Sequence, residues 1–573
     1  MAKKEFSSEL RILLAFALSF VILLISRPLL VRETPPAPPV TESSPAATAP
    51  ATQASQESQA SQKSSAPSPE NSTAVVPAQP TAGETEEEIT IEGDLYRVIF
   101  STRGAVVKSW TLKNYRDQQG NPLELVNAAA AGRYGAPLSV WVADEAVRME
   151  VNGALFVPSA KGSLKAPVTL TFEYSGGHVA ARKQFAFALS SYAVELESDL
   201  LTDGKPLAHE LAWRGSFGDI HDAGVRGTRW DVFYRQPDKT VRIASGDVEG
   251  ESSVASGPFA FAGIEDHFFA AAFVPPEAGL RVTAFQDEVT LPEQQKPTPS
   301  IGVAVGSDGA PANRLKFYVG PKKSDILSPV HANLPELIDY GWFAVVAKPL
   351  FYALRWIHDQ VVPNYGWAII LLTVVINMIL FPLKITSLRS ARKMQQLQPQ
   401  LRAIQDKYKG MKLKDPRRTQ MSQETMALYK QHGVNPVGGC LPMLLQIPFL
   451  YAFYKVLLVS IEMRHAPWIG WWIADLSAAE PQAIKFLPLL MCGTQFVLQK
   501  MSPTPSPDPT QQKIMMFMPV MMLGLFWGVS SGLVLYWLTG NLVGIAQQWY
   551  INRTDLKHEI EAKRNAAAKK KRK

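Results

Sequence analysis

Few residues of this 573-residue chain have the types and spacing that covalent chemistry needs. The segment GVSSG, residues 528–532, matches the pattern around a nucleophilic serine, but that pattern works only between a strand and a helix. Here it lies between two apolar runs, so we interpret Ser530 as part of a tight turn. No phosphate-binding loop of the type G-x-x-x-x-G-K-[ST] is found, and four histidines lack metal-ligand spacing: His178, His209, His221 and His267. We therefore expect no enzyme activity, no metal and no cofactor.

A different chemistry is indicated by polar side chains inside apolar runs. Thr373, Asn377 and Lys384 share one helical stripe, because offsets of four and seven residues return to nearly the same face. Lys455 lies within the apolar run 441–460. A lysine near the centre of a bilayer costs roughly 2.5 to 3.5 kcal/mol, so it should face a polar cavity or a partner. Two alternatives stay open: Lys455 extends outward to the membrane surface, or Asn377 makes only an interhelical hydrogen bond.

Membrane-spanning helices would have to position these residues. Five apolar blocks approach the roughly 20 residues that a span needs: 365–383, 441–460, 484–499, 514–529 and 532–549. An N-terminal apolar block at residues 12–25 makes six spans. Basic residues precede it and no small-x-small cleavage site follows, so we favour an uncleaved anchor over residues 1–32 rather than a signal peptide.

The region between the first and second spans changes character twice. Residues 33–88 are rich in Pro, Ala and Ser and hold few large apolar residues, which predicts a disordered tether. Residues 89–330 alternate apolar and polar positions in runs such as APVTLTFEY and YAVELESDL, which predicts a large antiparallel β-sandwich. Residues 331–364 contain an amphipathic helix that should lie along the membrane surface.

The distribution of charge predicts the orientation of the chain. Between Lys384 and Cys440 there are twelve Lys or Arg residues against three acids, and the tail 551–573 carries nine more. Basic segments favour the cytoplasmic side, whereas the loop 462–483 is acidic and rich in tryptophan. Both termini should therefore be cytoplasmic, with the β-domain in the periplasm of a bacterium.

The basic loop has helical periodicity, and its residues 384–435 are expected to form a helical hairpin within a core of spans over 365–550. Its positive charge suits anionic lipids or a ribosome, although a solvated connector is an open alternative. The two cysteines, Cys440 and Cys492, exclude a disulfide framework in the β-domain.

Several long segments resemble the YidC membrane protein insertases of Gram-negative bacteria, in the YidC/Oxa/Alb family. These segments include NPVGGCLPMLLQIPFLYAFYKVL, KMSPTPSPDPTQQKIMMFMPVMM and SSGLVLYWLTGNLVGIAQQWYINR, and the similarity runs from about Pro349 to Arg553. The resemblance implies a hydrophilic groove that is open to the cytoplasm and the lipid. It also implies nascent membrane proteins as substrates, the ribosome and the Sec translocon with its accessory subunits as partners, and a β-supersandwich in the periplasm.

The resemblance also marks groove residues. Thr373 matches the family pattern T-x-x-x-[RK]-x-x-x-[FY]-P, but Asn377 stands where family members usually carry a positive residue. We hypothesise that Lys455 on the third span supplies the missing charge. Tyr536 and Trp537 match an aromatic pair on the last span, one of which contacts substrate in the family.

Two other classes of protein are weighed against an insertase. A small-solute transporter or channel would also hold a buried charge, but the predicted spans contain no acidic residue and no paired broken helices. A membrane enzyme acting on periplasmic glycan would work through the β-domain. We expect an insertase in the bacterial inner membrane.

Overall fold

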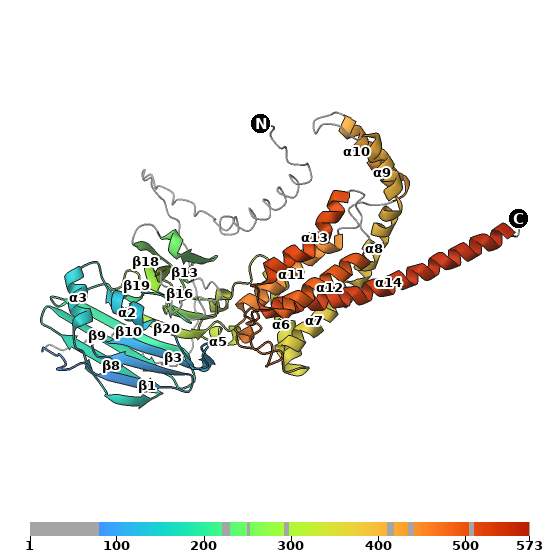
Figure 1. Ribbon diagram of the computed structural model, residues 1–573. Coiled ribbons are helices and arrows are strands. Elements are labelled where there is room, and N and C mark those ends of the chain that lie inside the picture. The colour runs from blue at the N-terminus through green and yellow to red at the C-terminus, as the bar shows by residue number, and fades with distance from the viewer. Residues whose placement is uncertain are drawn as a thin grey trace, which may run out of the picture. The chain divides into compact units, whose positions relative to one another are not determined.

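The computed structural model describes residues 80–571 except 220–229, 249–251, 291–296, 409–416, 434–440 and 503–508 (Figure 1). The predicted anchor, and the predicted tether as far as residue 79, lie outside the described residues. The chain forms two compact units, and the larger one, residues 74–507 and 518–573, contains all the sheets and all the site residues predicted above.

Three sheets make up the β-domain. The first has the order β4 (Pro122–Glu124), β3 (Val106–Arg116), β2 (Tyr96–Ser101), β1 (Glu88–Glu92) and β7 (Gly162–Lys165). The second has the order β14 (Thr240–Ala244), β13 (Asp231–Arg235), β16 (Ala262–Glu265), β17 (Phe269–Val274), β20 (Asn313–Pro321), β10 (Ala193–Thr202), β9 (Val179–Phe187), β8 (Val168–Ser175) and β6 (Val157–Pro158), with β11 (Lys205–Pro206) beside β10. The third has the order β15 (Ser252–Gly257), β18 (Leu280–Thr290), β19 (Pro297–Ser307), β12 (Glu210–Trp213) and β5 (Ser139–Trp141).

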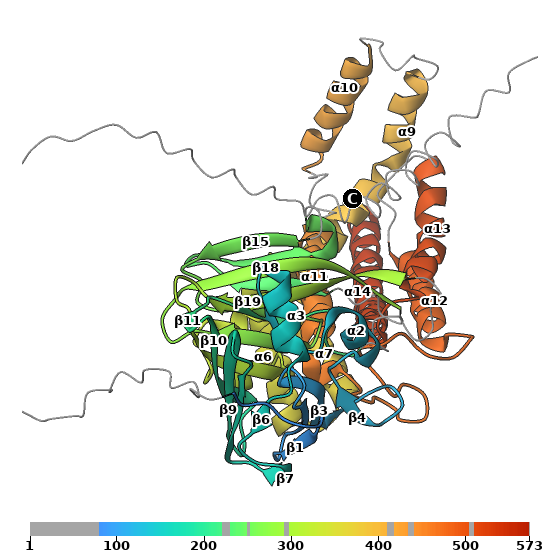
Figure 2. The same ribbon diagram turned by 90° about the vertical axis from the view of Figure 1, so that its left-hand side faces the viewer.

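The strands form where apolar and polar residues alternate, because successive side chains of a strand point to opposite faces. In β9, every second residue from Val179 to Phe187 is buried, and the intervening residues are half-exposed. The strand pairs are antiparallel apart from β1 with β7, and Figure 2 shows β15, β18 and β19 side by side. The predicted antiparallel β-domain is confirmed. Its contacts begin before the expected boundary at residue 89, since Thr81 N donates to Ser175 O.

Short helices connect the strands and lead out of the β-domain. They are α2 (Ala128–Tyr134), α3 (Glu145–Gly153), η1 (Ser245–Asp247), α5 (Ser324–Leu327) and η2 (Leu334–Leu337). The predicted amphipathic helix is α6 (Ala344–Gln360), whose apolar face buries Leu350, Phe351 and Leu354 while Trp356 is exposed on the other side.

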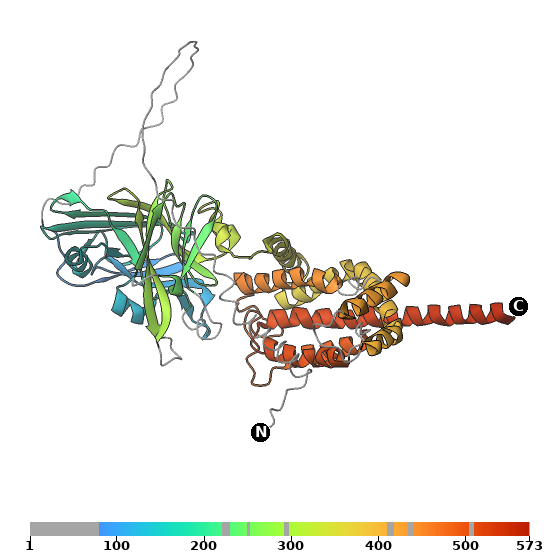
Figure 3. The same cartoon turned by 90° about the horizontal axis from the view of Figure 1, so that it is seen from above.

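The C-terminal part of the chain is helical. Its helices are α7 (Tyr365–Ile379), α8 (Phe381–Gln396), α9 (Gln398–Lys407), α10 (Arg417–Gln431), α11 (Leu441–Val459), η4 (Ile461–Met463), α12 (Phe486–Met501), α13 (Pro509–Phe526) and α14 (Ser531–Lys571). Helix α14 packs against α7 and α12, and α11 packs against α6. Figure 3 shows α14 running beside the other helices and continuing past them to the C-terminus.

Within the described residues, no single helix is both long and apolar enough to cross a bilayer. Helices α7 and α8 meet that criterion together, with a bend of 55° between them, and Ile447–Val459 and Ile514–Phe526 are shorter apolar helices. The bend follows Ile379, and Pro382 lies in the first turn of α8, where a missing N–H is tolerated.

The basic loop contains α8, α9 and α10. Met394, Leu397 and Leu401 form a small apolar core with Leu428 and Tyr429 of α10, and Lys407 Nζ lies 2.6 Å from Glu424 Oε1. Helices α9 and α10 thus pack against each other.

Candidate functional site

Thr373 and Asn377 lie on the buried face of α7, as their spacing predicts. Asn364 caps this helix by accepting a hydrogen bond from Trp367 N. The hydroxyl of Thr373 donates to Ile369 O at 2.6 Å, and Asn377 Nδ2 donates to Thr373 O at 2.9 Å. Both polar groups are therefore satisfied within their own helix, one turn back along the chain.

The end of α7 leaves a carbonyl available to another helix. The last carbonyls of a helix lack partners within it, and α7 ends at Ile379 before the bend into α8. The carbonyl of Asn377 instead accepts a hydrogen bond from Gln547 Nε2 of α14 at 3.0 Å. Gln547 is buried, so this bond connects α7 and α14 in the interior of the bundle.

The same glutamine holds a lysine. Lys384 Nζ donates to Gln547 Oε1 at 3.0 Å, and the lysine is half-buried. Its ammonium also lies close to Gly544, since a Cβ built on that glycine would be 3.4 Å from Lys384 Nζ. We call Thr373, Asn377, Lys384 and Gln547 the α7–α14 polar cluster.

Lys455 has different neighbours from the α7–α14 polar cluster. Its Nζ lies 3.5 Å from Asp339 Oδ2, in the segment that precedes α6. Gly341 packs against the lysine with a φ of +68°, and a Cβ there would be 3.1 Å from Lys455 Cε. Lys455 thus has an acidic partner outside α11, in the segment that precedes α6.

Tyr536 and Trp537 point to different helices. The ring of Tyr536 stacks on Phe453 of α11 with centroids 4.4 Å apart, and its side chain is almost fully buried. Trp537 Nε1 donates to Gln495 Oε1 of α12 at 3.2 Å, and its ring packs against Phe526. The pair therefore ties α14 to α11 on one side and to α12 on the other.

Sequence reasoning missed Gln547 and gave Lys384 no role of its own. Gln547 lies eleven residues after Tyr536, which is three helical turns and returns to the same face. Two adjacent glutamines near the end of an apolar run were the signal that could have identified it.

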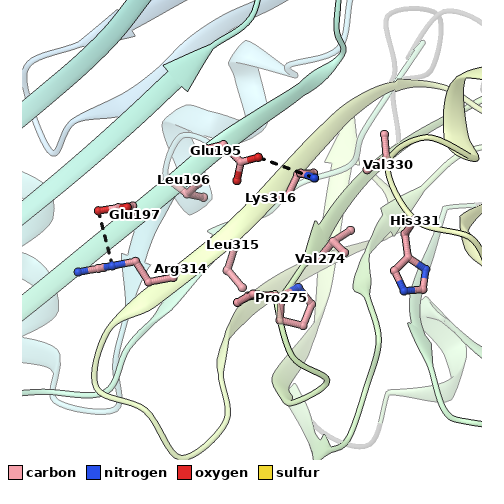
Figure 4. A pocket seen from close by; sticks show the side chains of 11 residues that line it. Glu195, Leu196, Glu197, Val274, Pro275, Arg314, Leu315, Lys316, Val330 and His331 are labelled. Carbon is pink, nitrogen blue, oxygen red and sulfur yellow. Dashed lines mark ion pairs between the residues drawn. The ribbon is translucent and has the colours of Figure 1, made fainter. Parts of the chain in front are cut away.

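The β-domain has a separate depression of about 410 Å³ along β10 and β20 (Figure 4). Across these strands Glu195 lies 3.8 Å from Lys316, and Glu197 lies 3.5 Å from Arg314. His331, Pro275 and Val274 line its other side. Because the acids and bases pair with one another, the depression offers no surplus charge that would select a ligand, and we assign none to it.

Among the described residues, no group of three or more His, Cys, Asp or Glu side chains could hold a metal ion.

Comparisons with known proteins cover nearly the whole chain. Residues 88–353 match the family model described as the YidC periplasmic domain, and residues 356–559 match the one described as the 60Kd inner membrane protein. The membrane protein insertase YidC of Syntrophus aciditrophicus is 35% identical over 94% of this chain and 99% of its own length. That of Ralstonia nicotianae is 35% identical over 85% of this chain and 87% of its own length. A crystal structure of an active YidC insertase with its first transmembrane domain resolved covers 83% of this chain and 95% of its own, with 20% identity and a TM-score of 0.35.

Proposed function

Because the chain belongs to the YidC family of membrane protein insertases, we propose that its helical part moves short polar segments of nascent proteins through a hydrophilic groove. Insertase activity, an inner-membrane location and a periplasmic β-domain follow from the family itself. The groove, its lining and the orientation of the termini are our proposal. In that proposal both termini are cytoplasmic.

The α7–α14 polar cluster is the observation that supports the groove most directly. An amide and an ammonium from two helices meet within a bundle whose other contacts are largely apolar. Polar groups inside a membrane are costly, and they mark pathways for polar cargo. We propose that Thr373, Asn377, Lys455, Tyr536 and Trp537 line this path.

The energetics of the step require no covalent chemistry. A polar segment loses its water when it crosses about 30 Å of hydrocarbon, and a groove that reaches part of the way shortens that path. The apolar segment that follows then leaves for lipid, driven by about 25 cal/mol for each Å² of apolar surface that it buries.

In this proposal, the basic segments of the chain determine which partners it contacts. The basic hairpin and the tail 551–573 would contact ribosomes and anionic lipids. The Sec translocon and its accessory subunits would work beside the insertase on longer substrates.

Site-specific photocrosslinking tests the groove. A photoreactive residue at position 377, 455 or 536 should crosslink to a stalled nascent membrane protein. The same residue in place of Met149, which is exposed on the β-domain, serves as the control. If the three helical positions crosslink no better than position 149, the proposed path is wrong. If the protein were instead a solute transporter or channel, cells depleted of it would lose solute uptake while membrane proteins still inserted.

A further inference from the structure

Three helices of the bundle begin against one loop. The segment between η4 and α12, residues 464–485, bonds to the residues at the start of α7, α12 and α14. The first N–H groups of a helix have no partner within it, and inside a membrane each of them needs an acceptor. We call this segment the η4–α12 loop, and in the proposed orientation it lies at the outer end of the bundle.

Glu480 of this loop caps α12. The residue before the helix, Lys485, makes no side-chain cap. Instead, the Glu480 carboxylate accepts hydrogen bonds from Phe486 N at 3.1 Å and from Leu487 N at 2.8 Å. Its third bond comes from Trp472 Nε1 at 2.6 Å, and only 3% of Glu480 is exposed. A buried carboxylate that has three donors and lies at the positive end of a helix is held strongly.

The start of α14 is bonded to the same loop through the backbone. Ser531 N donates to Ala478 O at 2.7 Å, and Gly532 N donates to Leu476 O at 2.8 Å. A Cβ on Gly532 would lie 3.0 Å from Leu476 O and 3.5 Å from Ile369 Cδ1 of α7. The loop, α14 and α7 therefore meet in direct contact at this point.

The start of α7 is covered by a tryptophan of the loop. Asn364, which caps α7, donates through Nδ2 to Pro467 O at 3.0 Å and to Trp468 O at 3.1 Å. The indole of Trp468 lies directly on the α7 backbone, because a Cβ on Gly366 would be 2.3 Å from Trp468 Cδ1. The loop thus holds three helix starts, and among the acceptors in these bonds only the Glu480 carboxylate is charged.

We propose that the η4–α12 loop is an ion-tight closure of the groove, and that Glu480 is the positioning residue that holds it shut. This proposal rests on the proposed function, because only a groove that contains water needs a closed end. Loss of the Glu480 carboxylate would release the loop from α12 and leave the positive helix ends without a compensating charge. Ions would then pass, and anions would pass more easily than cations, because the positive ends of helices exclude cations.

The conductance of a planar bilayer fused with liposomes of the purified full chain tests the closure. Glu480→Ala should raise the conductance at least about tenfold, because three charge-assisted hydrogen bonds are lost together. In a gradient of KCl, the reversal potential should shift toward that of chloride. Glu480→Gln keeps the shape of the side chain and serves as the second variant if Glu480→Ala does not fold. Glu480→Asp keeps the charge and should conduct less than Glu480→Gln.

Asp475→Asn is the matched control, since Asp475 is an acid of the same loop whose carboxylate bonds to Ser477 two residues away. It should leave the conductance within about twofold of the unmodified protein. An unchanged conductance in both Glu480→Ala and Glu480→Gln, or an equal rise in Asp475→Asn, overturns the proposal. A rise without preference for chloride overturns it as well, because a general loss of folding would give that result.

Insertion of a single-span substrate into the same liposomes tests the proposed function separately. If the unmodified protein inserts this substrate and the Glu480 variants do not conduct, the closure is wrong and the proposed function stands. If the unmodified protein inserts nothing, the proposed function itself fails.

Discussion

The ammonium of Lys183 lies 2.7 Å from the carbonyl oxygen of Leu138, inside the core of the β-domain. It also donates to Gly104 O at 2.8 Å and to Ala105 O at 3.2 Å. All three carbonyl residues have positive φ, with values of 70° for Gly104, 49° for Ala105 and 67° for Leu138. One buried lysine therefore pairs three carbonyls from two irregular backbone segments.

Replacing Lys183 should destabilise the β-domain. Lys183→Met keeps the length of the stem but leaves three buried carbonyls unpaired, at about 1 to 3 kcal/mol for each one that water cannot reach. We expect a loss of at least about 2 kcal/mol in the free energy of unfolding. Thermal unfolding of the full chain in detergent, followed by tryptophan fluorescence, measures it. The exposed Lys165→Met is the control, and an equal effect of the two substitutions would contradict this role.

The stability of the β-domain should also rise with pH above neutrality. Burial lowers the pKa of Lys183 from 10.5 to about 7. Between these two values the unfolded chain binds more protons than the folded one, so stability increases as the pH rises. The slope should approach about 1.4 kcal/mol per pH unit. Unfolding measured from pH 7 to 9 should show this slope in the unmodified protein, and its persistence in Lys183→Met would assign it to another group.

The burial of His209 predicts that the stability of the β-domain also depends on pH in the acidic range. Burial lowers the pKa of His209 to about 4, and its ring bonds to the Ser198 hydroxyl at 2.7 Å and to Leu207 O at 3.1 Å. Because the folded state resists protonation, stability falls as the pH drops from about 6.5 to 4. In His209→Asn, the free energy of unfolding should change less with pH between pH 4.5 and 6.5. The exposed His178→Asn should leave this dependence unchanged, and a flat profile in the unmodified protein would remove His209 as the cause.

The compensation hypothesis for Asn377 has its own test. If Lys455 supplies the charge that Asn377 lacks, Lys455→Ala should lower insertion severalfold, and adding Asn377→Arg should restore it. The pair with Asp339 suggests a different origin for any defect, the anchoring of the segment before α6. Asp339→Asn should then match Lys455→Ala, and Asn377→Arg should rescue neither. Insertion assays on the four variants separate the two explanations, and normal insertion by Lys455→Ala alone would end the hypothesis.

Contact with ribosomes should depend on salt. Twelve basic residues of the loop between Lys384 and Cys440, and nine in the tail 551–573, would neutralise phosphates and release counterions. Removing the tail should weaken co-sedimentation with ribosomes and reduce its decline with rising salt. Binding that salt does not affect would argue against this mode of contact.

Periodicity predicted the elements better than it predicted the contacts between them. Alternation located the strands. Apolar blocks located α7, α11, α12 and the start of α14 to within a few residues, but α14 continues well past the end of its block, residue 549, to Lys571. The contact of Lys384 with Gln547 joins residues 163 positions apart, and no local pattern encodes how α8 and α14 pack. The role of Lys183 could not be predicted from the sequence either. An inward position of a strand predicts an apolar residue, and the lysine there is stabilised by three carbonyls that are distant in the sequence.

Helix α14 runs without interruption from Ser531 to Lys571. At 1.5 Å per residue it measures about 60 Å, twice the thickness of a hydrocarbon layer. Its first half carries Tyr536 and Gln547, and its second half ends in the basic tail. Because the helix is continuous, a tilt of about 10° around Gln547 would move its far end by about 6 Å. A force on the basic tail, exerted by a bound ribosome, would therefore be transmitted along α14 to Gln547, which holds Lys384.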